Sequence, residues 1–109
     1  MTEAEEKNWN GAVFVDGCRF RARRRAWDCG ADEEDARWWG SVVWMAAGRD
    51  LMLGAQLSAA DEVVADERSR TARLTYRGLC ADALTEPFMA SVVRSARLAG
   101  ATVTLRLMA

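Results

Sequence analysis

Alternating apolar and polar residues flank Asp16-Gly17 near the start of the chain. An Asp-Gly pair supplies the positive backbone angles of a two-residue turn, so residues 12–27 are predicted to form a β-hairpin. One face of this hairpin, the predicted core face, carries Val13, Val15, Cys18, Phe20 and Ala22. The opposite face carries Phe14 and a row of four arginines, Arg19, Arg21, Arg23 and Arg25.

In the middle of the chain, a strand would carry apolar side chains on both of its faces. Residues 37–46 are rich in aromatic and β-branched residues, which is typical of a central strand covered on two faces, with Trp38 and Trp39 on opposite faces. Residues 51–55 are predicted to pair with this strand. For residues 58–68 a short helix that begins at Ser58 is favoured, and a strand at residues 62–66 remains the alternative.

The last third of the chain gives the clearest patterns. Residues 71–77 and 101–108 alternate as strands, and residues 86–99 repeat apolar positions at helical spacing. A crossover helix of this length places the two strands parallel to each other. The pattern predicts a single α+β domain at residues 9–109, with a flexible acidic tail at residues 1–8.

The predicted architecture follows from adding these elements. It is a mostly antiparallel sheet of about five or six strands, with the one main helix, residues 86–99, packed on one face.

The amino-acid composition limits the catalytic groups and metal ligands that the chain can supply. The chain has 109 residues, a net charge of −1 and no histidine, which removes the usual general base and the usual metal ligand. Its three cysteines have no disulfide or zinc spacing, and its start has no signal-peptide pattern. We therefore expect a cytoplasmic, non-enzymatic protein with no cofactor, no metal site and no membrane span.

Four consecutive acids form the second notable charge run: Asp32, Glu33, Glu34 and Asp35. They lack the glycine and the spacing of a calcium-binding loop. A solvated connector is the favoured interpretation. The alternative is an acidic patch that neutralises the arginine row or contacts a basic partner.

The arginine row has three interpretations: a solvated face, a contact for a protein, or a contact for a nucleic-acid backbone about 20 Å long. One helix covers only one face of a sheet, so an apolar second face needs a partner. The sequence therefore predicts a protein-interaction module (a small inhibitor, adaptor or assembly factor) that binds another protein or a second copy. A nucleic-acid-binding protein that uses residues 19–25 is the alternative. The candidate partner-binding residues are Phe14, Arg19, Arg21, Arg23, Arg25, Trp38 and Trp39.

Overall fold

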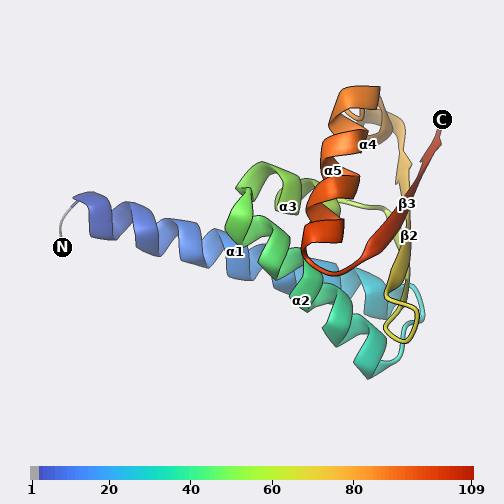
Figure 1. Ribbon diagram of the computed structural model, residues 1–109, viewed down its shortest axis with the longest axis horizontal. Coiled ribbons are helices and arrows are strands. Elements are labelled where there is room, and N and C mark those ends of the chain that lie inside the picture. The colour runs from blue at the N-terminus through green and yellow to red at the C-terminus, as the bar shows by residue number, and fades with distance from the viewer. Residues whose placement is uncertain (1–2) are drawn as a thin grey trace.

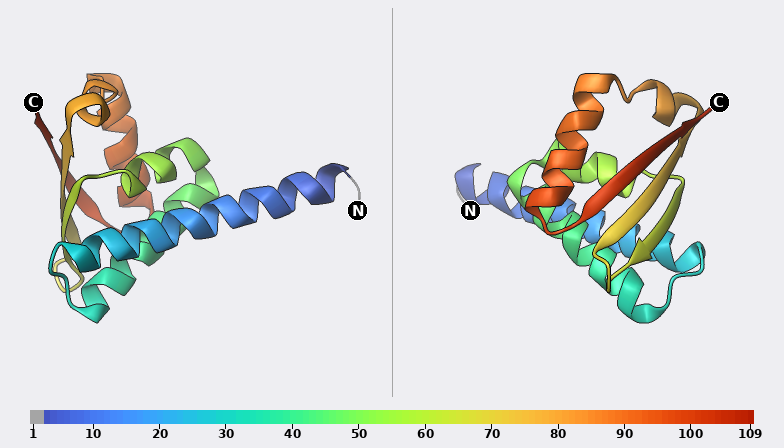
Figure 2. Two further views of the ribbon diagram at one scale, coloured as in Figure 1. Left: turned by 180° about the vertical axis from the view of Figure 1, so that it is seen from behind. Right: turned by 45° about the vertical axis from the view of Figure 1, so that its right-hand side comes forward.

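A helical layer and a small sheet make up the computed structural model, which describes residues 3–109, with side chains from residue 11 onward. The elements in chain order are α1 (Glu3–Asp28), α2 (Glu33–Arg49), α3 (Leu51–Ser58), β1 (Glu62–Asp66), β2 (Thr71–Arg77), α4 (Gly78–Asp82), α5 (Glu86–Leu98) and β3 (Thr102–Met108). The long helix α1 lies beside α2, and α1, α2, α3 and α5 all lie on the same side of the sheet (Figures 1 and 2). None of these helices has both the length and the apolar character needed to cross a bilayer.

The predicted sheet is wrong in size and pairing. Over residues 3–109 the chain is α+β, as expected, but it forms five helices and a mixed sheet of only three strands. The strand order is β1-β2-β3, with β1 antiparallel to β2 and β2 parallel to β3. Most of the residues that were assigned to additional strands are helical. The expected tail at residues 1–8 includes two residues outside the described part of the chain, and α1 begins at Glu3.

The predicted β-hairpin at residues 12–27 lies inside α1. Cys18, Ala22 and Ala26 recur every four residues and are buried, so they form one continuous small-residue side of a helix. Arginine and alanine, which fill most of residues 19–26, both favour helix. Gly17 sits in the helix with nothing within 4 Å of the position of an added Cβ. Packing of the small-residue side therefore outweighs the local turn signal of Asp16-Gly17.

The predicted central strand at residues 37–46 is wrong for a related reason, because these residues belong to α2. Asp32 caps this helix by accepting a hydrogen bond at Oδ1 from the Asp35 amide at 2.8 Å. The chain is apolar on several sides here because α2 is a central helix, in contact with α1, α3, α5 and β1. The predicted strand at residues 51–55 is likewise part of α3, which Asp50 caps through the Leu53 amide.

The last third of the fold confirms the sequence patterns. The strand at residues 71–77, the helix from residue 86, the final strand and the parallel pairing across the helix are all observed. The favoured helix starting at Ser58 is wrong: Ser58 ends α3, and the alternative strand is present as β1. The inner face of the sheet buries Val63, Leu74 and Tyr76 against the helices.

A glycine sets the distance between α2 and α3. A Cβ added at Gly54 would lie 2.3 Å from the Cα of Ala47 in α2, which is closer than van der Waals contact allows. We expect Gly54→Ala to lower the free energy of unfolding by about 3 kcal/mol or more, measured by urea denaturation. Gly48→Ala is the matched control, because nothing lies within 4 Å of that position. The control should be neutral or stabilising by up to about 1 kcal/mol, and equal losses would contradict the close packing.

Tyr76 makes the stability sensitive to alkali. Burial raises the pKa of its hydroxyl above the ordinary value of 10.0, and the nearby charges of Cys80 and Asp61 add to the rise. The hydroxyl also donates to the Gln56 carbonyl oxygen at 2.8 Å. Above pH 10 the unfolded chain loses this proton while the folded chain keeps it, so stability falls as pH rises, by about 1.4 kcal/mol per pH unit.

To check this, the free energy of unfolding is measured between pH 8 and pH 11 for the natural chain and for Tyr76→Phe. We expect the phenylalanine variant to be less stable at pH 8 by about 1 kcal/mol, because it loses the hydrogen bond. The gap should close as the pH rises. Parallel curves would show that Tyr76 is not the group responsible.

Candidate functional site

The predicted arginine row does not exist, because its members lie on a helix. Each residue of an α-helix turns the direction of the side chain by about 100°, so residues two apart point to different sides. Arg21 donates to the Ser58 hydroxyl at 3.3 Å, on the α3 side. The Arg19 guanidinium lies over the Phe20 ring at 4.9 Å instead, while Arg23 is half-buried and Arg25 is exposed. The four side chains therefore form no single basic surface.

The predicted aromatic contacts are also separated. Trp39 is fully buried in the core, and Trp38 is half-buried beside it, with ring centroids 6.3 Å apart. Phe14 is exposed on α1, six residues and therefore about a third of a turn from the direction of Phe20. The structure does not bring Phe14, the arginines and the two tryptophans together.

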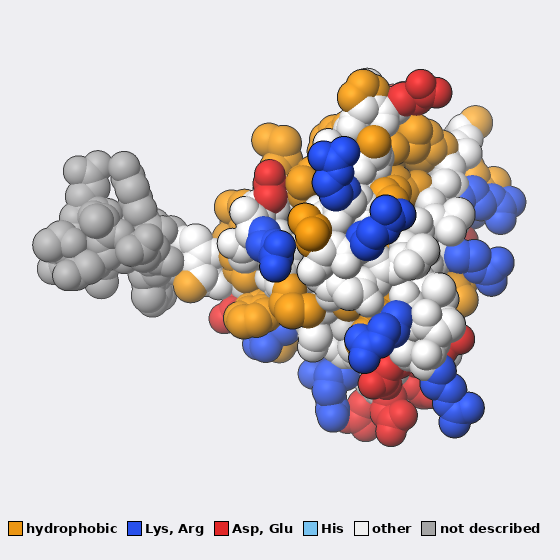
Figure 3. All heavy atoms as spheres, in the orientation of Figure 1, with side chains coloured by type: hydrophobic (Ala, Val, Ile, Leu, Met, Phe, Trp, Pro, Cys, Tyr) orange, Lys and Arg blue, Asp and Glu red, His pale blue; other side chains and the backbone are white. Residues whose placement is uncertain are grey.

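The four acids start a helix. Besides the cap formed by Asp32, Glu33 pairs with Arg37 at 2.5 Å and Asp35 accepts a hydrogen bond from the Glu67 amide at 3.0 Å. Acidic residues in the first turn of a helix are stabilised by the positive end of its dipole. Figure 3 shows the acidic side chains gathered where α2 begins, with basic side chains beside them. No cluster of three potential metal ligands occurs among the residues that the structure describes.

A different aromatic surface is present on the outer side of the two long helices. We call it the α1–α2 face, and its residues are Val13, Asp16, Phe20, Arg23, Trp27, Glu33, Arg37, Ser41 and Trp44. Val13, Phe20 and Trp27 recur every seven residues, which is close to two helical turns, so they line one side of α1. They are 52%, 57% and 55% exposed, and Trp44 of α2 is 44% exposed.

Specific contacts fix the two helices under this face. The Trp44 indole Nε1 donates to Asp16 Oδ1 at 3.1 Å and so joins α2 to α1. Gly40 of α2 lies against α1 so closely that an added Cβ would be 3.1 Å from the Arg19 carbonyl oxygen. Arg23 also approaches the same glycine, with its Cβ at 3.1 Å from that point. The exposed side chains therefore stand on a rigid base.

Two hollows flank Phe20 on the α1–α2 face. The larger has a volume of about 610 Å³ and is lined by Phe20, Arg23, Arg24, Trp27 and Glu33. The smaller has a volume of about 280 Å³ and is lined by Arg19, Phe20, Arg23, Arg37 and Ser41. The face thus combines projecting rings, adjacent hollows and charges of both signs.

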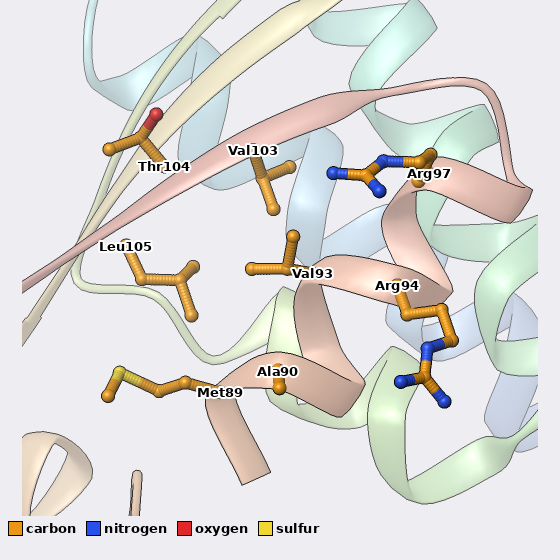
Figure 4. Close-up of a pocket in the computed structure, with 8 residues that line it drawn as sticks. All are labelled: Met89, Ala90, Val93, Arg94, Arg97, Val103, Thr104 and Leu105. Carbon is orange, nitrogen blue, oxygen red and sulfur yellow. The ribbon is translucent and has the colours of Figure 1, made fainter. Parts of the chain in front are cut away.

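A second hollow surface lies between α5 and β3 and is shown in Figure 4. It has a volume of about 530 Å³ and is lined by Met89, Ala90, Val93, Arg94, Arg97, Val103, Thr104 and Leu105. Val93, Val103 and Leu105 point toward one another across it (Figure 4). We call this surface the α5–β3 groove.

The sequence contained a signal for the α1–α2 face that the hairpin interpretation concealed. Phe20 was assigned to a core face by period-two alternation, whereas the spacing of Val13, Phe20 and Trp27 fits a helix. The α5–β3 groove was missed for another reason. Both of its walls were predicted correctly, but the small number of strands that leaves β3 at the sheet edge was not.

The buried Trp39 makes a testable contrast with its half-buried neighbour. The Trp39 indole Nε1 has no hydrogen-bond partner, although the side chain is fully buried. We expect Trp39→Ala to cost about 3–5 kcal/mol of unfolding free energy, and Trp38→Ala clearly less. Trp39→Phe should cost at least about 2 kcal/mol less than Trp39→Ala, because it fills most of the space and removes an unpaired donor. Urea denaturation measures all three, and equal losses at Trp38 and Trp39 would contradict the assignment.

No known protein family, curated protein or solved structure matches this chain. Its function is therefore inferred from its own residues and their geometry.

Proposed function

We propose that this protein is a non-enzymatic protein-interaction module that binds a second copy of itself through the α1–α2 face. The observation that carries the proposal is the exposure of Phe20 and Trp27 on one side of α1, with Trp44 exposed on α2 where it contacts Asp16 of α1. Tryptophan, phenylalanine and arginine are enriched in the centres of protein interfaces. Scattered exposed apolar residues are ordinary, but large rings gathered on one rigid face favour a binding surface.

The charges of the face favour a second copy as the occupant. A twofold dimer brings the same surface together twice, so a surface with charges of both signs can meet itself without net repulsion. The α1–α2 face carries Arg23 and Arg37 together with Asp16 and Glu33. Its rings and hollows also occur on the same surface, so Phe20 or Trp27 of one copy can enter a hollow of the other. A face of one sign would repel itself, whereas this one is suited to self-association.

The predicted alternative of nucleic-acid binding has less support. It depended on a continuous row of arginines, and the side chains of Arg19 and Arg21 are directed to different sides of α1 by their contacts with Phe20 and Ser58. The action of the module in the cytoplasm remains part of the proposal. It is supported by the three cysteines, all of which are free thiols.

Sedimentation equilibrium tests the self-association. The natural chain, of 12.1 kDa, should show a concentration-dependent dimer at micromolar protein. Phe20→Ser combined with Trp27→Ser should weaken the dimer at least about 100-fold, because truncation of a central aromatic anchor costs about 2 kcal/mol or more.

The matched control is Leu79→Ser, which removes an 86% exposed side chain on α4, away from the α1–α2 face. It should dimerise like the natural chain. Thermal unfolding by circular dichroism establishes that each variant is folded. A natural chain that stays monomeric at 100 μM or so, or a double variant that dimerises normally, would refute the proposal.

A further inference from the structure

The two edges of the sheet differ in how they are covered. The edge of β1 faces the connection between α1 and α2: Cys29, Gly30 and Ala31 line one hollow together with β1 residues, and the Glu67 amide just beyond β1 is bonded to Asp35. The edge of β3 has no further strand among the described residues. The right view of Figure 2 shows β3 at one side of the sheet, with β2 on one side of it and α5 on the other. β3 is therefore the open edge.

The backbone groups at this edge can be identified from the ladder on the other side. The Thr102 amide donates to the Arg70 carbonyl oxygen at 2.9 Å, so Thr102 points toward β2. In a parallel pair the N–H and C=O of one residue point to the same side, and successive residues alternate. Val103, Leu105 and Leu107 therefore present their N–H and C=O groups to the open edge. The side chains of these residues lie on the inner face, and those of Val103 and Leu105 line the groove beside α5.

β3 carries few of the features that protect an exposed strand. Natural sheet edges are commonly shortened, bulged, or marked by proline or inward-pointing charges. β3 spans seven residues in regular register with β2 and contains no proline. Its one charged residue, Arg106, is exposed on the face that points away from the helices. Val103 is only 5% exposed, whereas Leu105 is half-buried and Leu107 is exposed. The part of the edge from Leu105 to Leu107 can therefore accept another strand.

The groove beside this edge has a distinct charge. Its floor is apolar, formed by Val93, Val103 and Leu105, while Arg94 and Arg97 stand on the α5 side. Both arginines are exposed, and neither takes part in the ion pairs found among the described side chains. The groove therefore favours apolar side chains along its floor and a carboxylate near α5.

We propose that β3 binds an extended, acidic segment of another protein as a fourth strand. The segment pairs with the backbone groups of Leu105 and Leu107, places alternate apolar side chains in the α5–β3 groove, and directs acidic side chains to Arg94 and Arg97. This is strand addition, in which the backbone supplies affinity and alternate side chains supply specificity. It uses a surface separate from the α1–α2 face.

A second copy of the chain fits this edge less well. Antiparallel pairing of β3 with another β3 would supply apolar side chains, but the strand carries no acid and one arginine, Arg106. Arg94 and Arg97 of both copies would then remain without opposite charges. The charge of the groove therefore favours a different, acidic partner.

The test uses fluorescence anisotropy with a labelled, C-terminally amidated peptide, in which threonine alternates with two valines and then with two glutamates. A matched peptide carries lysines in place of the glutamates. We expect the acidic peptide to bind at least about tenfold more tightly at low salt, with the difference shrinking as salt is added. Arg94→Glu combined with Arg97→Glu should abolish or reverse this preference. The control Arg73→Glu, on the exposed face of β2, should leave it unchanged.

N-methylation tests the backbone pairing directly. Two acidic peptides are methylated on complementary sets of alternate amides. In strand addition only one set faces β3, so one peptide should lose binding and the other should retain it. Equal binding of the acidic and basic peptides, no binding at all, or equal behaviour of the two methylated peptides would overturn the proposal.

The dimer variants separate this inference from the proposed function. Phe20→Ser combined with Trp27→Ser should bind the acidic peptide as the natural chain does. A dimer that survives these substitutions and that the peptide dissociates would mean that β3 pairs with itself, which would overturn the choice of an acidic partner. Circular dichroism confirms folding of each variant.

Discussion

The close approach of α1 and α2 is the constraint on which the rest of the structure depends. From residue 11 onward, where the side chains of α1 are described, the buried ones are all small: Cys18, Ala22 and Ala26. α2 meets α1 at Gly40, where even a methyl group would be crowded. Two helices can pack at so short a distance only if their facing sides are small. The large apolar residues of α1 then have no place between the helices. Phe20 and Trp27 project outward because of this choice of inner side.

The large helical share of the chain also limits the size of the sheet. With so much of the chain in helices, the described residues form only three strands, and all the large helices lie on one side of them. α5 contacts β3 on the inner side of the sheet, and α1 and α2 contact β1. The polar outer face is left to solvent, and β3 is left at the edge. The α1–α2 face and the α5–β3 groove are thus both by-products of how the core is closed. They lie on different elements and expose different groups. The α1–α2 face exposes aromatic rings, whereas the α5–β3 groove lies beside the backbone edge of β3 and two arginines.

Sequence patterns predicted the C-terminal half well and the N-terminal half poorly, for physical reasons. In residues 71–108 the alternation and the helical spacing are unambiguous, and the crossover rule fixes the parallel pairing. In residues 12–27 two periods coexist: Val13, Val15, Phe20 and Ala22 fit a strand, while Cys18, Ala22 and Ala26 fit a helix. Local turn chemistry favoured the strand, and only the packing partner decides between them.

The second error came from interpreting burial on several sides as evidence for a central strand. Residues 37–46 are apolar on several sides because α2 is enclosed by other helices and by the sheet. The acids at its start, considered a solvated connector, contained a usable helix signal in Asp32 and the acids that follow it. One of Trp38 and Trp39 was expected in the core, but the sequence did not decide which, because the burial of Trp39 depends on the elements that surround it.

The contrast between the inward and outward residues of α1 bears on which sequence changes such a protein can tolerate. The small inward residues are fully buried between the helices, while the large outward ones are about half exposed and bury a smaller fraction of their surface. If the α1–α2 face binds as we propose, substitutions at Val13, Phe20 or Trp27 would alter the choice of companion at a smaller cost to stability than enlargement of Ala22, which would separate the helices. One scaffold could in this way acquire new binding preferences through a handful of outward changes while its interior is left intact.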